Sequence, residues 1–199
     1  MGKFLENLYR ALALGILLML IAIFALHGTA IGEQTATWSN FFVMYLHIFA
    51  GILWIGLLYY FNFVQIPTMG KVPAELKPAV SKFIAPAALF WFRWAALFTI
   101  ILGLGTAQMK EADFGGIVGV LTFSPNVVVI GVGMWLAIIM AANVWFVIWP
   151  NQKRALGIVQ ADDAAKAKSA RTAMIASRIN TVLSIPMLYC MVMQGGLPV

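Results

Sequence analysis

Five long apolar runs constrain this chain more than any other feature of its sequence. They cover roughly residues 11–30, 41–66, 83–106, 126–149 and 172–193. None contains an aspartate or glutamate, and each has about the 20 residues that an α-helix needs to cross a bilayer. Their side chains are continuously apolar rather than alternating, which excludes a transmembrane barrel. The sequence therefore predicts an all-α, polytopic transmembrane helical bundle with about five spanning helices.

The composition indicates that lipid is the solvent for most of the protein surface. Hydrophobic residues make up 62% of the 199 residues, and charged residues only 10%. A soluble domain carries roughly a quarter charged residues. Because the length suits one bundle, we expect residues 1–199 to form a single integral membrane domain with no second soluble domain.

Basic residues fall in alternate segments between the apolar runs. They precede the first run, separate the second from the third, and separate the fourth from the fifth: Lys3, Arg10, Lys71, Lys77, Lys82, Lys153, Arg154, Lys166, Lys168 and Arg171. The other three segments hold only Lys110. Because basic loops stay in the cytoplasm, the alternation predicts a cytoplasmic N-terminus and an exported, periplasmic C-terminus. Membrane topology thus accounts for the net charge of +6, and we expect no nucleic-acid partner.

The stretch 115–123 is apolar but too short to cross a bilayer. Pro125 follows it closely and suits the first turn of the fourth spanning helix. We interpret the stretch as a short interfacial or re-entrant helix on the outer side. A sixth span is the weaker alternative, because it would break the alternation of loop charge.

Ionisable side chains within a span are costly, so each one needs a physical reason. Those in this chain are His27, His47, Arg93 and Arg178. The predicted topology places both histidines toward the outer side of the membrane. The single cysteine, Cys190, lies in an apolar run and is interpreted as a small buried side chain.

His47 is the strongest candidate for a cofactor ligand. Helical spacing places Gly51 one turn and Trp54 two turns after it, on the same face of the second span. A neutral imidazole ligates haem iron, and the missing side chain of Gly51 would let a planar macrocycle approach the helix. The same glycine equally favours close packing of two helices. The residues thus predict a haem b site with His47 as the metal ligand, and helix packing as the alternative.

Two further side chains complete the predicted cofactor site. A site ligated by both His27 and His47 fits the topology; alternatively, His27 hydrogen-bonds water among the lipid headgroups. Arg93 lies among the aromatic residues of segment 90–94, and no span offers a carboxylate to pair with it. It would bind a haem propionate or a lipid headgroup, hydrogen-bond backbone carbonyls, or snorkel to the membrane surface.

Four segments carry a family likeness. They are HIFAGILWIG at 47–56, continuing to Phe63, then WFRWAALFT at 91–99, NVWFVIWPNQK at 143–153 and SRINTVLSIPMLYCMV at 177–192. In this order they resemble the membrane region of bacterial membrane-bound urate oxidases (urate hydroxylases). The resemblance covers spans two to five and implies a multi-pass protein of the bacterial inner (cytoplasmic) membrane.

The chain also departs from that family. Members that oxidise urate carry a C-terminal cytochrome c domain with a CxxCH site, whereas this chain ends at Val199 without that motif. The last span of the family is often followed by a histidine, but the stretch here reads Gln194-Gly195-Gly196. The resemblance thus implies a stand-alone relative of the membrane domain, and we do not expect this chain alone to oxidise urate.

A second likeness involves only the spacing of His47, Trp54 and Gly56. This spacing is similar to that in the haem-binding bacterial protoporphyrinogen oxidase and in the copper-resistance membrane proteins. It implies again that His47 is a haem or metal ligand.

These observations lead to the hypothesis of a small redox-type membrane protein with haem b at His47. It would pass electrons to an outer partner, such as a periplasmic cytochrome, or act as a subunit of an oxidoreductase complex. The alternative is a cofactor-free structural or assembly subunit, in which His47 and Arg93 hold helices or bind lipid. A transporter fits less well, because no span contains a carboxylate and no repeat is visible. The aromatic surface favours association with further copies or with other membrane subunits.

Overall fold

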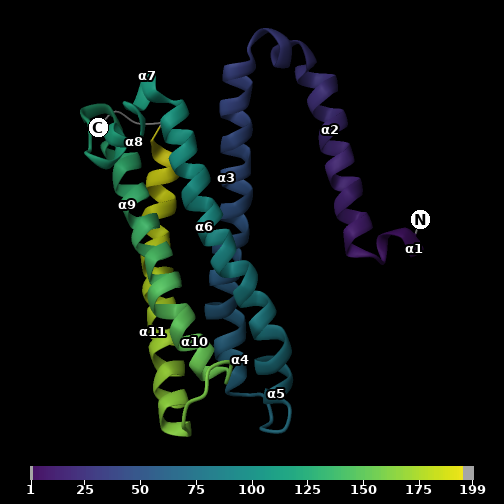
Figure 1. Cartoon of the computed structure of the whole chain (residues 1–199), viewed down its shortest axis with the longest axis vertical. Coiled ribbons are helices and arrows are strands. Elements are labelled where there is room, and N and C mark those ends of the chain that lie inside the picture. The colour runs from purple at the N-terminus through teal and green to yellow at the C-terminus, as the bar shows by residue number, and fades with distance from the viewer. Residues whose placement is uncertain (1, 195–199) are drawn as a thin grey trace. The chain divides into compact units, whose positions relative to one another are not determined.

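The computed structural model describes residues 2–194, with side chains from residue 4 onward, and its regular structure there is helical (Figure 1). Five helical stretches within it are long and apolar enough to span a membrane: Leu8–Glu33, Thr35–Met69, Lys77–Met109, Pro125–Ala155 and Asp163–Met193. They confirm the predicted fold class and the five predicted spans. Each stretch runs past its predicted range at one or both ends, because the helices continue into polar residues beyond the apolar run.

The spans are assembled from shorter elements. After the short α1 (Gly2–Leu5), the first span is α2 (Leu8–Glu33), and the second comprises α3 (Thr35–Tyr59), η1 (Tyr60–Gln65) and α4 (Ile66–Met69). The third comprises α5 (Lys77–Ala79), η2 (Val80–Ile84) and α6 (Ala85–Met109), followed by α7 (Glu111–Phe114) and α8 (Gly116–Leu121). The last two are η3 (Pro125–Val127), α9 (Val128–Asn143), η4 (Val144–Ile148), α10 (Trp149–Ala155) and α11 (Asp163–Met193).

Three of the spans contain a π-helical turn, and in each a proline explains its position. Proline donates no hydrogen bond, and its ring collides with the carbonyl four residues earlier. The carbonyls four residues before Pro67, Pro86 and Pro150 lie within η1, η2 and η4, respectively. A π turn widens the helix at such a point, so the clash is relieved without ending the span.

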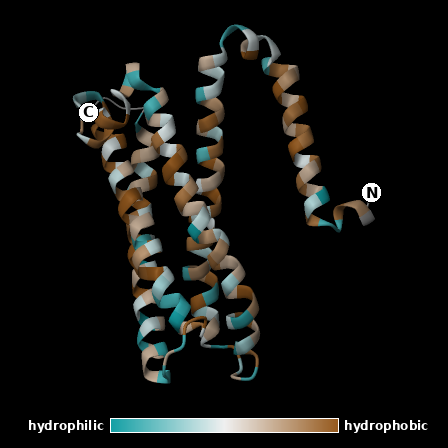
Figure 2. Ribbon diagram, viewed as in Figure 1, coloured by the Kyte–Doolittle hydropathy of each residue, from teal (hydrophilic) through white to brown (hydrophobic). Residues whose placement is uncertain are grey.

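Contacts divide the chain into two units, Met1–Phe42 and Val43–Val199. The first unit holds α2 and the first turns of α3. The side chain of Asn7 caps α2 by accepting hydrogen bonds from the backbone N–H groups of Tyr9 and Arg10. Hydrophobic residues predominate along α2 (Figure 2), yet none of its residues is buried. That all 199 residues form one membrane domain stays a prediction.

The second unit has a close-packed core. Trp54, Leu58, Phe92 and Met140 are almost fully buried where the later part of α3 meets α6 and α9. Close approach of α9 and α11 depends on a small residue, since a Cβ atom at Gly133 would lie 2.9 Å from the Cβ of Cys190. Cys190 itself is buried and free, as predicted.

Amides join α9 to α11 inside the apolar core. Asn143 donates to the Ala176 carbonyl at 2.9 Å and to Oδ1 of Asn180 at 2.7 Å. Asn180, which is fully buried, donates in turn to the Met140 carbonyl at 3.0 Å. Lipid offers no hydrogen bonds, so these side chains satisfy each other across the two helices.

Hydroxyl groups join α11 to the end of the second span. Nδ2 of Asn62 donates to Oγ of Ser177 at 2.8 Å, and the Tyr59 hydroxyl lies 3.0 Å from that of Ser184. These bonds fix the rotation of the π-helical segment η1 and the end of α3 relative to α11.

The short stretch before Pro125 forms α7 and α8, and α8 is far too short to span a membrane. Gly115 ends α7 in the left-handed region with φ of 65°, where glycine is favoured. Gly119 packs directly on the Phe114 carbonyl, and Val120 is fully buried. The predicted short helix is therefore present and the sixth span is absent, whereas the side of the membrane on which the helix lies stays a prediction.

Candidate functional site

His47 lies on the face of α3 that packs against α6. Its Nδ1 atom is 2.8 Å from the Thr99 carbonyl oxygen. The ring also lies over Gly103, where a Cβ atom would be 2.8 Å from Cε1 of the imidazole. The imidazole is thus held by a hydrogen bond on one edge and by a glycine beneath it.

This contact assigns the tautomer of the neutral ring. A carbonyl only accepts hydrogen bonds, so Nδ1 carries the proton and Nε2 carries the lone pair. No residue within the described part of the chain hydrogen-bonds to Nε2 of His47. An imidazole that donates through one nitrogen to a backbone carbonyl is the arrangement typical of a histidine that ligates a metal through the other.

Gly51 contacts the same turn of α6. A Cβ atom at Gly51 would meet Cγ2 of Thr99 at 3.8 Å, which is an ordinary van der Waals distance. The space beside this glycine is therefore occupied by Thr99, as the helix-packing alternative expects. His47 and Gly51 are the two predicted site residues that the structure brings together.

Trp54, two turns further along α3, is fully buried, and its indole N–H has no hydrogen-bond partner in the described part of the chain. Oδ1 of Asn62 and Oε1 of Gln65 are also buried without a partner. Seven residues of α-helix separate His47 from Trp54, or about 10 Å along the axis. Gly51 and Trp54, on the predicted face of α3, both face other helices, and the indole N–H of Trp54 is a buried donor without a partner among the described residues.

Arg93 occupies a separate place in the second unit. Its guanidinium carbon lies 3.9 Å from the centroid of the Trp149 ring and 5.5 Å from that of Phe90. Six residues separate Arg93 from Thr99, which is about 9 Å along the axis of α6 and a different face of that helix. Arg93 and His47 are therefore not in direct contact, and a role of Arg93 at a haem propionate stays a prediction.

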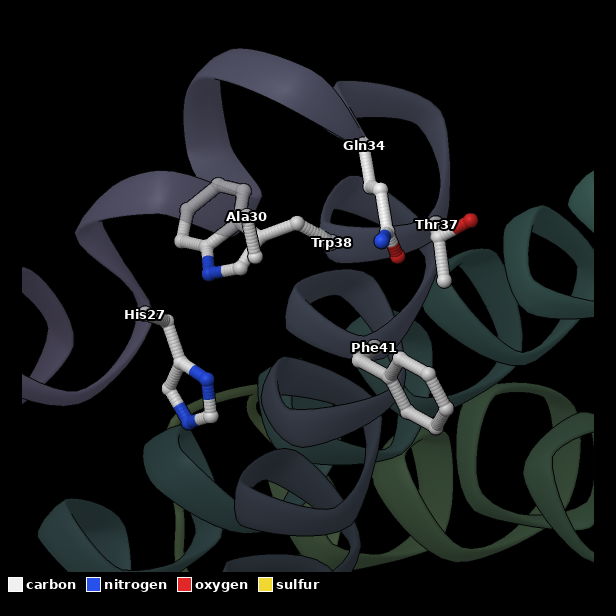
Figure 3. A pocket seen from close by; sticks show the side chains of 6 residues that line it. All are labelled: His27, Ala30, Gln34, Thr37, Trp38 and Phe41. Atoms are coloured by element: carbon white, nitrogen blue, oxygen red, sulfur yellow. The ribbon is translucent and has the colours of Figure 1, made fainter.

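His27 belongs to the first unit, where it lines an open cavity of about 470 Å³ with Ala30, Gln34, Thr37, Trp38 and Phe41 (Figure 3). Figure 3 shows its imidazole below the indole of Trp38 in this cavity. Its side chain is exposed. His27 and His47 thus lie in different units, and ligation of one group by both stays a prediction.

The donor set limits what the site can hold. Residues 4–194 contain no cluster of three or more His, Cys, Asp or Glu side chains suited to a metal ion. Haem supplies four nitrogen ligands of its own and needs only one or two axial side chains. His47 fits such an axial role by its tautomer and fixed ring, whereas Arg93 is engaged with Trp149 rather than near the imidazole.

Sequence reasoning identified His47 but missed the two residues that hold it. Thr99 and Gly103 contribute a backbone carbonyl and an absent side chain, and neither carries a chemical signal of its own. The spacing of Gly103 and Gly105 in an otherwise apolar span was the available signal, since small residues mark helix contacts in membranes.

The C-terminal part of the second unit matches the model of a known protein family. Residues 116–195 match the family model described as urate oxidase N-terminal. This urate oxidase-like segment begins at α8 and includes α9, η4, α10 and α11. It confirms the resemblance drawn from segments 143–153 and 177–192, whereas the likeness of segments 47–56 and 91–99 lies outside the matched range. No curated protein and no solved structure matches the chain.

Gln194, directly after α11, has a structural role. Its Oε1 accepts a hydrogen bond from the Ile130 backbone N–H at 2.7 Å. Its Nε2 donates to the Asn126 carbonyl at 3.0 Å. The side chain thus joins the end of α11 to the start of α9.

Proposed function

We propose that this chain is a small redox-type membrane protein in which Nε2 of His47 is the axial ligand of haem b. The observation that carries the proposal is the hydrogen bond from Nδ1 to the Thr99 carbonyl at 2.8 Å, which leaves Nε2 as the ligating atom. When bound, haem would supply one-electron transfer. The chain itself would orient the ring through Thr99 and Gly103 and exclude water by the surrounding apolar helices.

The proposal needs only His47 from the predicted set. Arg93 is stacked on Trp149, and Gly51 packs on Thr99. A second axial ligand from His27 remains part of the hypothesis. It would be recognised by a change in the haem spectrum when His27 is replaced.

Absorption spectra of the purified protein, oxidised and reduced, test this proposal. We expect a Soret band in the wild type and its loss in His47→Ala and in His47→Asn. His27→Ala distinguishes one protein ligand from two: the band should be unchanged if His47 is the single protein ligand and shifted if His27 is the second. A wild-type protein without a Soret band, or a band that survives in both His47 variants, would contradict the proposal.

The alternative function is a cofactor-free structural or assembly subunit. The same hydrogen bond favours it, because it connects α3 to α6 in a medium that offers no competing partners. The two His47 variants separate the functions, since asparagine retains an N–H donor near the position of Nδ1. If His47 acts only as a clamp, His47→Asn should keep the thermal stability that His47→Ala loses, and neither variant should alter the spectrum.

We also propose a cytoplasmic N-terminus and a periplasmic C-terminus, which the alternation of loop charge supports. A membrane-impermeant maleimide should label Asp113→Cys in intact cells, and Lys166→Cys only after the cells are broken. The reverse pattern would invert the orientation. Under the proposed orientation the electron partner is a periplasmic cytochrome or another membrane subunit, and a second copy of the chain is the proposed partner within the bilayer.

A further inference from the structure

A cluster of cations and aromatic rings lies away from His47, where α6 meets α10. Arg93 and Lys153 are its two cations, and both contact the ring of Trp149. The distance from the ring centroid is 3.9 Å to Cζ of Arg93 and 5.7 Å to Nζ of Lys153. Phe90 adds a second ring beside the guanidinium, 5.5 Å from Cζ. Two residues far apart in sequence thus bring positive charge to one indole.

The backbone of Arg93 is held by a contact with η4. Nε1 of Trp145 donates to the Arg93 carbonyl at 3.2 Å, and the rings of Trp145 and Trp94 meet edge to face at 5.4 Å. These contacts connect α6 to η4 next to the cluster. The backbone of Arg93 is therefore anchored beside η4, and its guanidinium lies against the rings of Trp149 and Phe90.

Neither cation has an anionic partner among residues 4–194, whose side chains the structure describes. The ion pair within the described residues joins Lys166 to Asp163, both on α11. No hydrogen bond from the guanidinium of Arg93 to a described residue is present, and none of the five predicted apolar runs contains a carboxylate. Stacking on rings satisfies the face of a guanidinium but leaves its N–H groups, which point along its edges. The site therefore presents N–H donors and positive charge, and it is suited to bind an anion with several acceptor oxygens.

The depth of the cluster indicates which anion is available. Trp149 lies four residues, about 6 Å, before Lys153 on the helix. Lys153 and Arg154 close the fourth span, so the cluster lies near a membrane surface, at the level where tryptophans and lipid headgroups meet. Arg93 lies near the middle of its own apolar run, and its side chain meets Trp149 because α6 contacts η4 directly before α10.

We propose that Arg93 and Lys153, held against Trp149, bind the phosphodiester of an anionic phospholipid. Planar guanidinium groups bind phosphate oxygens through paired N–H donors, and a neighbouring ammonium adds a point charge. The site is separate from His47 and independent of the proposed haem function. It would seat one lipid in the angle between the third and fourth spans.

The test uses the full chain purified in neutral detergent, with dioleoyl phosphatidylglycerol as the probe. The apparent unfolding temperature is followed as lipid is added, and dioleoyl phosphatidylcholine and inorganic phosphate are titrated in parallel. We expect saturable stabilisation by phosphatidylglycerol at least tenfold more tightly than by phosphatidylcholine. Equal stabilisation by inorganic phosphate alone would assign the site to a soluble anion and overturn the lipid assignment.

Variants of Arg93 and Lys153 test whether the stabilisation by phosphatidylglycerol arises at this cluster. Arg93→Gln should weaken the phosphatidylglycerol response at least tenfold, Lys153→Gln about threefold, and Arg93→Lys should fall between Arg93→Gln and the wild type. Arg178→Gln is the matched control, because Arg178 is an exposed arginine within another span and no described ring contacts its guanidinium. A loss in Arg178→Gln as large as that in Arg93→Gln would overturn the proposal, since the effect would then be net charge.

The absorption spectrum separates this inference from a role of Arg93 in holding haem. If the wild type has a Soret band, Arg93→Gln should leave it unchanged while losing the lipid response. A shifted or lost band together with an unchanged lipid response would overturn the lipid site and assign Arg93 to the cofactor.

Discussion

The first and last spans of this chain differ in burial, and the difference is the opposite of what their hydropathy suggests. Leu8–Glu33 has the highest mean hydropathy of the five spans, yet 0% of its most apolar window is buried inside the protein. Asp163–Met193 has the lowest, and 33% of its window is buried. In water the more apolar helix would be the one inside. In lipid, apolarity only shows that a helix can enter the membrane.

Small and polar residues distinguish the last span, which is packed within its unit, from the first, which has no buried residue within its own unit. The buried face of α11 includes Ser177, Asn180 and Ser184, and it meets Gly133 of α9. The glycines of α2 have no atom within 4 Å of the position of an added Cβ. Association in a membrane depends on close backbone approach and hydrogen bonds, because lipid tails are as apolar as leucine. Substitutions at matched positions in the two units can test this explanation.

The largest effect is expected for a core leucine. Leu58 is 0% exposed, and Leu58→Ala should lower the free energy of unfolding by about 2–4 kcal/mol, because the cavity cannot fill with lipid. Leu18, on α2, is 57% exposed, and Leu18→Ala should change it by less than about 0.5 kcal/mol. Unfolding in mixed micelles measures both values. Equal costs would show that α2 is packed as tightly as α3.

Glycine substitutions should give the next largest difference. Gly133→Leu places atoms where the Cβ of Cys190 lies 2.9 Å away, and it should cost about 1–3 kcal/mol by overpacking. Gly15→Leu, on α2, meets open space and should be neutral or slightly stabilising. Thermal unfolding of the two variants in the same detergent decides between them. A neutral Gly133→Leu would contradict the close α9–α11 contact.

A smaller loss is expected for the buried amide of α11. Asn180→Leu keeps the branched shape of the side chain but removes the bonds to Asn143 and the Met140 carbonyl, at a cost of about 1–2 kcal/mol. Thr29→Leu, at an exposed position of α2, should cost less than about 0.5 kcal/mol. The difference in unfolding free energy is the measurement. A stabilising Asn180→Leu would show that apolar packing outweighs the amide bonds.

The smallest effect is expected for two glycine-to-alanine substitutions within the second unit, at Gly103 and Gly51. Gly103→Ala must displace the His47 ring, since the new Cβ would lie 2.8 Å from Cε1, and should cost about 1 kcal/mol. Gly51→Ala meets Thr99 only at 3.8 Å and should be neutral or gain a few tenths of a kcal/mol, about the helix propensity of alanine. Stability and the absorption spectrum are read together. Identical behaviour of the two variants would contradict the placement of the His47 ring on Gly103.

Much of the fold was predictable because it depends on local signals. Continuous apolar runs predicted the five spans, and the brevity of 115–123 together with the loop charges made a sixth span the weaker alternative. The ends of the helices were less predictable: the third span was predicted to begin at residue 83, but its helix begins at Lys77, since polar residues continue a helix as readily as they end it. The π turns had a local signal in Pro67, Pro86 and Pro150 that the span assignment did not use.

The candidate site was only half predictable. His47 was recognisable because a titratable ring within a span is rare, and its face with Gly51 follows from helical spacing. The residues that contact this face were not recognisable in the sequence. Thr99 contributes its backbone carbonyl, and Gly103 contributes the space left by its missing side chain. The same holds for Arg93, whose lack of an intramembrane acid was visible in sequence, whereas its stacking on Trp149 was not.

The sequence by itself determined that the chain enters a membrane as five helices. It also determined which few ionisable side chains lie within those helices and require a physical explanation. Both conclusions follow from the cost of placing polar groups in lipid, which acts on each residue separately. Only the tertiary structure decided which faces meet: that His47 packs on α6, that Arg93 and Lys153 share one indole, and that α2 remains unburied in its unit. Lipid and protein interior are equally apolar, so no gradient of hydrophobicity along the sequence points to the neighbour of a helix.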